Sequence, residues 1–231
     1  FGAEIPSHGY TMFHQRIVFF SSVLFVFGAA LLGFFTARRL FPGRWASLYS
    51  ALAVSLGTSI FYYGTYMPSY AHGMDAFFCA LFVYYWCKTY GELRWKRFGI
   101  LGLLLGFCAL IRITGFAFGI CIAVELVALC FRKSLTSSRL RWILGLVGKG
   151  ALTLVIAVLV FSPQIITWKI VFGEFYTSPM GPNFVRLEHS QIFEILFSSR
   201  NGWLSSHPLT YLGVLGLFFI PKKLWPISLA L

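Results

Sequence analysis

The sequence predicts an all-α protein: a polytopic transmembrane helical bundle with about 7–8 spans in its 231 residues. Hydrophobic residues make up 58% of the chain and charged residues only 11%, whereas a soluble domain carries about 25% charged residues. Several apolar runs of about 20 residues could cross a hydrocarbon core of about 30 Å. These runs lack the alternation of barrel strands, so helices are the structure expected to satisfy the backbone in lipid.

The apolar runs define seven spans and the beginning of another. The predicted spans are 17–37, 45–66, 75–87, 98–111, 113–131, 150–171 and 208–220. Pro163 is expected to kink or end the sixth span, because proline cannot donate the helical hydrogen bond. The run 224–231 is too short to cross a membrane, so we expect the natural protein to continue beyond both ends of this sequence.

Basic residues predict which loops face the cytoplasm. Fourteen of the 19 lysines and arginines fall in alternate loops, around 38–44, 88–97, 132–149 and 222–223. Cytoplasmic loops carry such an excess, so the segments 2–16, 67–75, 112–114 and 164–207 are expected outside. The net charge of +12 therefore indicates topology and attraction to acidic lipid headgroups, and no nucleic-acid partner is expected.

Asp75 and His72 are the first candidate site residues. Asp75 is the only aspartate in the chain and lies at the outer start of the third span. His72, three residues earlier, would share its helix face and could form an acid–imidazole pair that handles protons or contacts phosphate. The alternatives are an acid that stabilises a helix N-terminus and a surface histidine without a role.

Arg112 is the most distinctive charged residue, because it lies between two apolar runs that no soluble loop separates. A guanidinium at the outer interface can grip a lipid phosphate with two hydrogen bonds. The alternative is a side chain that reaches the headgroups without specificity.

The outer loop 164–207 contains two further features. Residues 184–197 carry apolar side chains at helical spacing, which predicts an amphipathic helix lying on the membrane or packed on the protein. The run 197–208 gathers serines with Arg200, Asn201, Trp203 and His207 just before a span. Such residues bind sugar hydroxyls and stack on sugar rings, although a polar loop that merely re-enters the membrane has the same composition.

Other residues are expected to be structural. Glu125, within the fifth span, should pair with a basic residue of a neighbouring helix. Gly102 with Gly106, and Gly115 with Gly119, fit the small-xxx-small pattern of closely packed membrane helices. The five cysteines all lie in apolar runs without a CxxC pair, so no disulfide or metal site is predicted.

Several of these features occur in an order that resembles membrane glycosyltransferases related to the dolichyl-phosphate-mannose protein mannosyltransferases. The motifs are Gly57-Thr58, Phe61-Tyr62-Tyr63, Pro68-Ser69, His72, Asp75-Ala76-Phe77-Phe78, Leu110-Ile111-Arg112-Ile113-Thr114, Pro163-Gln164, Trp168-Lys169, Gly173, Phe197-Ser198-Ser199-Arg200-Asn201-Gly202 and Pro208-Leu209. Together they cover most of the chain.

The resemblance implies a single C-class glycosyltransferase domain over 1–231, with the outer loop 164–207. Such enzymes transfer a sugar from a polyprenyl-phosphate donor to an acceptor outside the cytoplasm. Their main catalytic carboxylate lies in a first outer loop that we expect upstream of this sequence, so that role is not carried over to Glu4. The substrate-binding residues expected here are His72, Asp75, Arg112, Arg200 and His207.

Two other functions remain open from the sequence: a secondary transporter, and a non-catalytic flippase or assembly subunit for glycolipids. The expected partners are membrane lipids, the polyprenyl-phosphate sugar and an unidentified acceptor. No cofactor is assigned, and the sequence does not decide whether a divalent metal takes part. Short basic loops favour a bacterial or archaeal plasma membrane, with the site facing outside.

Overall fold

The computed structural model describes residues 11–68, 70–132, 139–177, 192–199 and 202–219. Within these ranges every regular element is a helix, so the predicted all-α class is confirmed for the described part of the chain. The chain divides into two compact units, Phe1–Thr89 and Tyr90–Leu231. Each unit is considered by itself.

Three segments of the described chain are long and apolar enough to cross a membrane: Met12–Leu40, Ile113–Phe131 and Leu140–Phe172. They coincide with the first, fifth and sixth predicted spans. An integral membrane protein is therefore supported by helix length and composition. The other described helices are too short to be identified as spans in this way. Helix length therefore supports three spans and leaves the predicted seven or eight unconfirmed.

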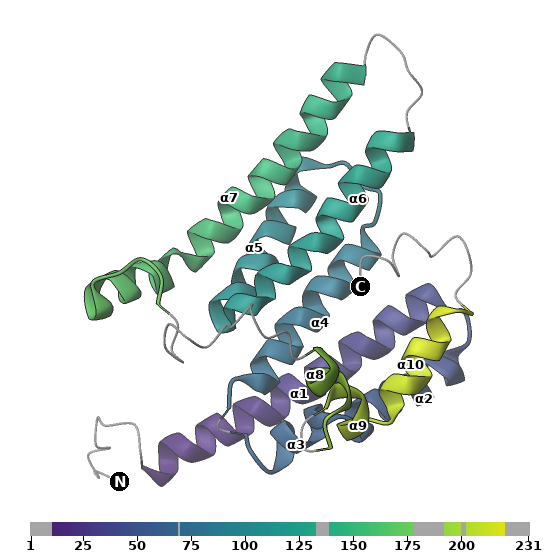
Figure 1. The fold of residues 1–231 in the computed structure, drawn as a ribbon, viewed down its shortest axis with the longest axis vertical. Coiled ribbons are helices and arrows are strands. Elements are labelled where there is room, and N and C mark those ends of the chain that lie inside the picture. Colours follow the sequence, from purple (N-terminus) through teal and green to yellow (C-terminus); the bar gives the residue numbers. More distant parts are fainter. Residues whose placement is uncertain (1–10, 69, 133–138, 178–191, 200–201, 220–231) are drawn as a thin grey trace. The chain divides into compact units, whose positions relative to one another are not determined.

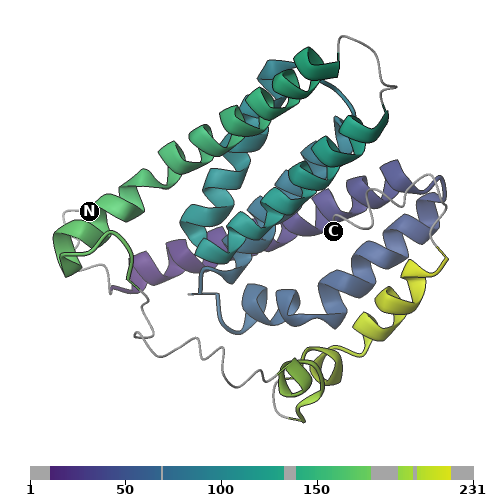
Figure 2. The same cartoon turned by 45° about the horizontal axis from the view of Figure 1, so that its top comes forward.

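The first unit contains α1 (Met12–Leu40), α2 (Arg44–Gly57), α3 (Ser59–Thr65) and α4 (His72–Lys88), as Figure 2 shows. The predicted span over 45–66 is not one continuous helix, because Thr58 separates α2 from α3. Thr58 is extended at φ −124° and ψ 174°. Its hydroxyl donates to Val54 O at 2.6 Å and accepts from the Ile60 N–H at 3.4 Å. The side chain thus takes over backbone bonding where the helix breaks.

α1 and α4 pack against each other along their length. A side chain at Gly28 would lie 2.7 Å from the ring of Phe77, so the two helices approach closely at this glycine. Phe25 packs on Phe77 with 5.4 Å between ring centroids. At the other end of the pair, Arg39 Nη2 donates to Lys88 O at 2.8 Å. These contacts fix the axial register of the two helices.

The second unit begins with α5 (Trp95–Ile111), the 3₁₀ helix η1 (Ile113–Phe118), α6 (Gly119–Arg132) and α7 (Arg139–Phe172), where α5 and α7 lie side by side (Figure 1). The close packing predicted for Gly102 and Gly106 is confirmed. A Cβ at Gly102 would lie 2.6 Å from Thr153 O, and one at Gly106 would lie 2.5 Å from Val160 Cβ. The Thr153 hydroxyl also donates to Phe98 O at 3.0 Å.

Pro163 does not end α7, which continues to Phe172. Proline lacks the N–H that would reach Leu159 O in a regular helix. The hydroxyl of Ser162 donates to that carbonyl instead, at 2.7 Å. The helical bonding is therefore repaired locally, and the first residues of the segment 164–207, which was expected to lie outside the membrane, are helical as far as Phe172.

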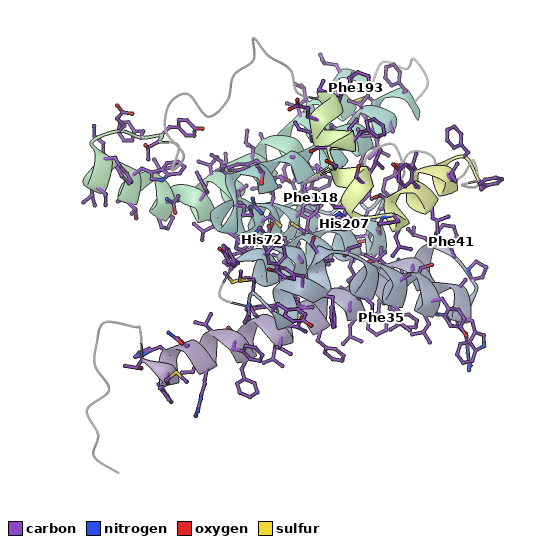
Figure 3. All side chains as sticks on the ribbon, turned by 60° about the horizontal axis from the view of Figure 1, so that its bottom comes forward. Phe35, Phe41, His72, Phe118, Phe193 and His207 are labelled. Carbon is purple, nitrogen blue, oxygen red and sulfur yellow. The ribbon has the colours of Figure 1, made fainter. Side chains whose placement is uncertain are left out.

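Three short helices follow in the described chain: α8 (Ile192–Phe197), α9 (Trp203–Ser206) and α10 (Leu209–Leu217). α8 forms the end of the amphipathic helix predicted over 184–197, and the rest of that prediction lies outside the described residues. Its apolar side chains are exposed except for the half-buried Leu196, with Phe193 at 80% (Figure 3). α10 covers most of the seventh predicted span.

Glu125 forms the ion pair that the sequence predicted. Its Oε2 lies 2.8 Å from Arg97 Nη2, and the two side chains are 0% and 2% exposed. Glu125 Oε1 also accepts from the Gly91 N–H at 2.7 Å, and Arg97 Nη1 donates to Glu92 O at 3.0 Å. These additional bonds satisfy both charges, which a buried ion pair requires in order to offset its desolvation.

Replacing Glu125 with alanine should lower the free energy of unfolding by about 3–5 kcal/mol, because it leaves the Arg97 charge buried without its counter-ion. Titration with SDS in mixed micelles, followed by thiol labelling of the buried cysteines, would measure this loss. Glu92→Ala is the matched control, because that carboxylate is exposed. An equal loss in both variants would contradict the structural importance of the pair.

Gly102→Ala should destabilise the protein by about 1–3 kcal/mol, because the new methyl group overlaps the Thr153 carbonyl. Gly99 is the control on the same helix: its Cβ would lie 3.6 Å from Ile156, an ordinary contact. Alanine there should leave stability unchanged or raise it by up to about 1 kcal/mol through helix propensity. The same denaturation assay compares them, and similar values would refute the close α5–α7 contact.

Candidate functional site

The α3–α4 connection, residues 66–71, is held against the middle of α1. The Ser22 hydroxyl donates to Pro68 O at 2.5 Å. Immediately after the connection, a Cβ at Gly73 would lie 3.3 Å from Ser22 O and 3.2 Å from Val26. A Cβ at Gly64, just before the connection, would also lie 3.0 Å from Val26. The two glycines and the serine therefore draw this polar connection onto α1.

His72 lies at the start of α4 (Figure 3), within a cluster of aromatic rings. Its ring centroid lies 3.9 Å from that of Tyr63 and 5.9 Å from that of Tyr70. Tyr62 stacks on Tyr66 beside this cluster, with centroids 5.8 Å apart. Tyr66 and Tyr70 are exposed at 74% and 53%. The connection thus presents aromatic faces and one imidazole, a surface on which a ring-shaped polar ligand can stack.

Asp75 lies in the first turn of α4, where the helix dipole favours a negative charge. Its Oδ1 accepts a hydrogen bond from Cys79 Sγ at 3.5 Å, one turn further along α4. Its side chain is half-buried. The expected pairing of Asp75 with His72 stays a prediction, because the contacts described for His72 are with tyrosines.

Contacts with α1 show how far along that helix the site lies. Lys88, at one end of α4, meets Arg39, and Gly73, at the other end, meets Ser22. These two points on α1 are 17 residues apart, which is about 26 Å of helix. α1 continues beyond Ser22 to Met12, and Arg16 lies about 9 Å past Ser22. The start of α4 is therefore recessed from the end of α1.

Arg112 interrupts the helical chain, as the sequence predicted. It is extended at φ −146° and ψ 126°, between α5 and η1. The turn is closed by the Gly115 N–H, which donates to Arg112 O at 2.7 Å. A Cβ at Gly115 would lie 2.5 Å from Cys108 O, so the turn folds back onto α5 and leaves no space for a side chain. The Arg112 side chain is exposed.

Arg112 is recessed along α7 in the same way that α4 is recessed along α1. Gly102 meets Thr153 and Ile156, and Gly106 meets Ala157 and Val160, so α5 and α7 run parallel. Six residues after Gly106, Arg112 should lie level with about residues 163–166 of α7. α7 then extends about 10 Å further to Phe172.

The remaining predicted site residues belong to the segment around α9. Arg200 lies outside the described residues. His207 is half-buried between α9 and α10, and its carbonyl accepts from the N–H and the hydroxyl of Thr210. The Gly202 N–H donates to Ser198 O at 2.9 Å, and a Cβ at Gly202 would lie 2.5 Å from that oxygen. The local turn therefore requires glycine.

The sequence did not predict which residues pack around His72. Tyr63 and Tyr70 were not predicted as site residues, although tyrosines flanking a histidine near the end of a span were a usable signal. Ser22 could not be recognised, because a single serine in an apolar run carries no pattern. Among the described residues, no group of three histidine, cysteine or carboxylate side chains is arranged to hold a metal ion.

No family model, curated protein or solved structure matches this chain. The resemblance to membrane glycosyltransferases therefore stays a prediction.

Ser22→Ala should loosen the α3–α4 connection, because it removes the hydroxyl that bonds Pro68. Loss of one such hydrogen bond costs about 0.5–1.5 kcal/mol, so amide hydrogen exchange in residues 66–73 should quicken about three- to tenfold. Mass spectrometry of peptides from the detergent-solubilised protein measures this exchange. Ser21→Ala is the control, because Ser21 bonds Val18 of its own helix. Unchanged exchange in Ser22→Ala would mean that the connection is held by other contacts.

Proposed function

We propose that this chain is a multi-pass membrane protein with seven or eight spans that transfers a sugar from a polyprenyl-phosphate donor to an acceptor on the non-cytoplasmic side. The observation that carries the proposal is the recessed position of the polar residues at the start of α4. The basic loops support the orientation, and a bacterial or archaeal plasma membrane is the setting we infer.

The depth of Asp75 follows from α1, which supplies a scale across the bilayer. Arg16 and Arg39 are separated by 23 residues, about 35 Å of helix, close to a hydrocarbon core of about 30 Å. If these arginines mark the two interfaces, Ser22 lies about 9 Å below the outer one. Asp75 follows Gly73, which contacts Ser22, by two residues and lies about 3 Å deeper.

A carboxylate at this depth is energetically unfavourable. Placing an aspartate at the centre of a transmembrane helix costs about 2.5–3.5 kcal/mol on insertion scales. Irregular backbone, such as the α3–α4 connection, is tolerated at membrane depth only when protein covers it or when it lines a water-filled cavity. Both facts favour a polar, ligand-binding recess, since ionisable residues inside membranes are functional by default.

A lipid-linked sugar suits such a recess. Its phosphate and sugar lie near the headgroups, while its long chain remains in the membrane. We propose that Asp75 and His72 bind sugar hydroxyls, with the neighbouring tyrosines stacking on the sugar ring. Arg112, recessed on its own unit, is proposed to bind the donor phosphate with its guanidinium, whose planar donors match phosphate oxygens. Arg200 and His207 remain proposed sugar contacts.

The reaction follows from these roles. The bond between the sugar and the phosphate breaks, the phosphate leaves with the electron pair, and positive charge develops on the sugar ring. The acceptor oxygen forms the new glycosidic bond, and its proton passes to the main catalytic carboxylate that the resemblance implies. A fixed guanidinium at the leaving phosphate stabilises the transition state, because it needs no reorganisation during the reaction.

Secondary transport is the second candidate, because the depth of Asp75 fits this function as well. Transporters place ionisable residues near the middle of the bilayer. A carboxylate more than about 9 Å below the interface approaches that depth. The two functions differ in one decisive respect: a transferase breaks the bond between sugar and carrier, and a transporter does not.

The test uses the full-length protein in proteoliposomes, with a panel of radiolabelled polyprenyl-phosphate sugars. The wild type should release label from the carrier, and Arg112→Ala should slow release by about 10²–10³-fold, as expected for one lost charged contact in the transition state. Asp75→Asn should reduce release as well.

Glu92→Gln and Arg94→Ala serve as controls, because they change the same two kinds of charge on exposed residues of a loop predicted to face the cytoplasm. Normal release by Asp75→Asn would remove Asp75 from the site. No release from any donor by folded wild-type protein would refute the transferase, and label accumulating inside the vesicles would establish transport.

A further inference from the structure

An apolar groove runs along the first unit between α1 and the pair α2–α3. Its volume is about 620 Å³, within the range of about 300–1,000 Å³ found for small-molecule pockets. The walls are almost entirely hydrocarbon, and they include Phe19, Phe34, Leu48, Leu52 and Phe61. From Phe34 to Phe19 the groove follows about 22 Å of α1.

The groove exists because α1 and α2 pack loosely. A second cavity of about 200 Å³, lined by small side chains such as Ala29, Gly33 and Ser50, lies along the same pair of helices. In lipid, hydrophobicity does not drive helices together, since the hydrocarbon tails are equally apolar. Atoms that line a void also lose dispersion contacts. A hydrocarbon chain in the groove restores those contacts without any polar partner.

Arginines lie at the cytoplasmic end of the groove. Arg38 follows Phe34 by four residues on α1, and Arg44 precedes Leu48 by four residues on α2, so each lies on the face that lines the groove. Both side chains are exposed. Arg38 Nη1 donates to Pro42 O at 2.9 Å, which holds the guanidinium beside the α1–α2 turn. Two positive charges at one mouth complement a lipid phosphate.

We propose that this groove binds one anionic phospholipid of the cytoplasmic leaflet, with its phosphate between Arg38 and Arg44 and an acyl chain along the groove. The inference depends on α1 and α2 spanning the membrane, and it is independent of sugar transfer. One leaflet provides about 15 Å of hydrocarbon, less than the length of the groove. The acyl chain therefore contacts the cytoplasmic part, at Leu31, Leu48 and Leu52, and ends before Phe19.

The test places the full-length protein in phosphatidylcholine nanodiscs with a small fraction of phosphatidylglycerol that carries a diazirine on its acyl chain. After irradiation, peptide mass spectrometry should locate the label at residues 31–34 and 48–52. The same probe on phosphatidylcholine should label these residues at least fivefold less. Native mass spectrometry should show phosphatidylglycerol retained on the wild type, and at least tenfold less retained on Arg38→Gln/Arg44→Gln.

Two further variants sharpen the test. Arg94→Gln removes an exposed arginine from the second unit and should retain phosphatidylglycerol normally. Ala51→Trp fills the groove while keeping both arginines, and should abolish acyl labelling at 31–34 and 48–52.

Equal labelling by the two phospholipids would overturn the proposal, as would normal retention in the double arginine variant. Absence of label from the groove would show that protein covers it. Displacement of the label by polyprenyl phosphate would assign the groove to the carrier instead. If the double variant fails to fold, the comparison of the two probes on the wild type decides alone.

Discussion

Close contact at glycine between a long helix and a helix of 17 residues is the interaction on which both units depend. In the first unit α4 lies on α1, with Gly28 against Phe77 and Gly73 against Ser22. In the second unit α5 lies on α7 through Gly102 and Gly106. In each case the register leaves the shorter helix recessed from the far end of its partner. The recess, rather than any single side chain, gives His72, Asp75 and Arg112 their unusual positions.

A second feature is common to both units: side-chain hydroxyl groups donate hydrogen bonds to backbone carbonyls in apolar surroundings. Thr58 bonds across a helix break, Ser162 bonds the carbonyl left by Pro163, and Ser22 and Thr153 join neighbouring segments. A hydroxyl reaches these carbonyls without bringing a net charge into an apolar region. This explains why irregular backbone is compatible with so hydrophobic a chain.

The sequence was sufficient for the helical class, for the break at Arg112 and for the pairing of Glu125, because each has a strong local signal. A charge between two apolar runs and a carboxylate inside one are both costly unless the fold provides for them. The division at Thr58 was missed, and the effect of Pro163 was left open between a kink and an end of the helix. Both depend on whether a side-chain hydroxyl finds a carbonyl, which hydropathy does not record. The recess at α4 was missed because it depends on the register between two helices.

The buried pair of Arg97 and Glu125 has a consequence for how the protein enters its membrane. Arg97 begins α5 and Glu125 lies within α6, so either helix inserted alone would carry an unmatched charge. The turn at Arg112 brings the two charges together, and the Gly91 N–H completes the carboxylate's bonding. The pair therefore favours insertion of α5 and α6 together, as a hairpin in which these two buried charges neutralise each other.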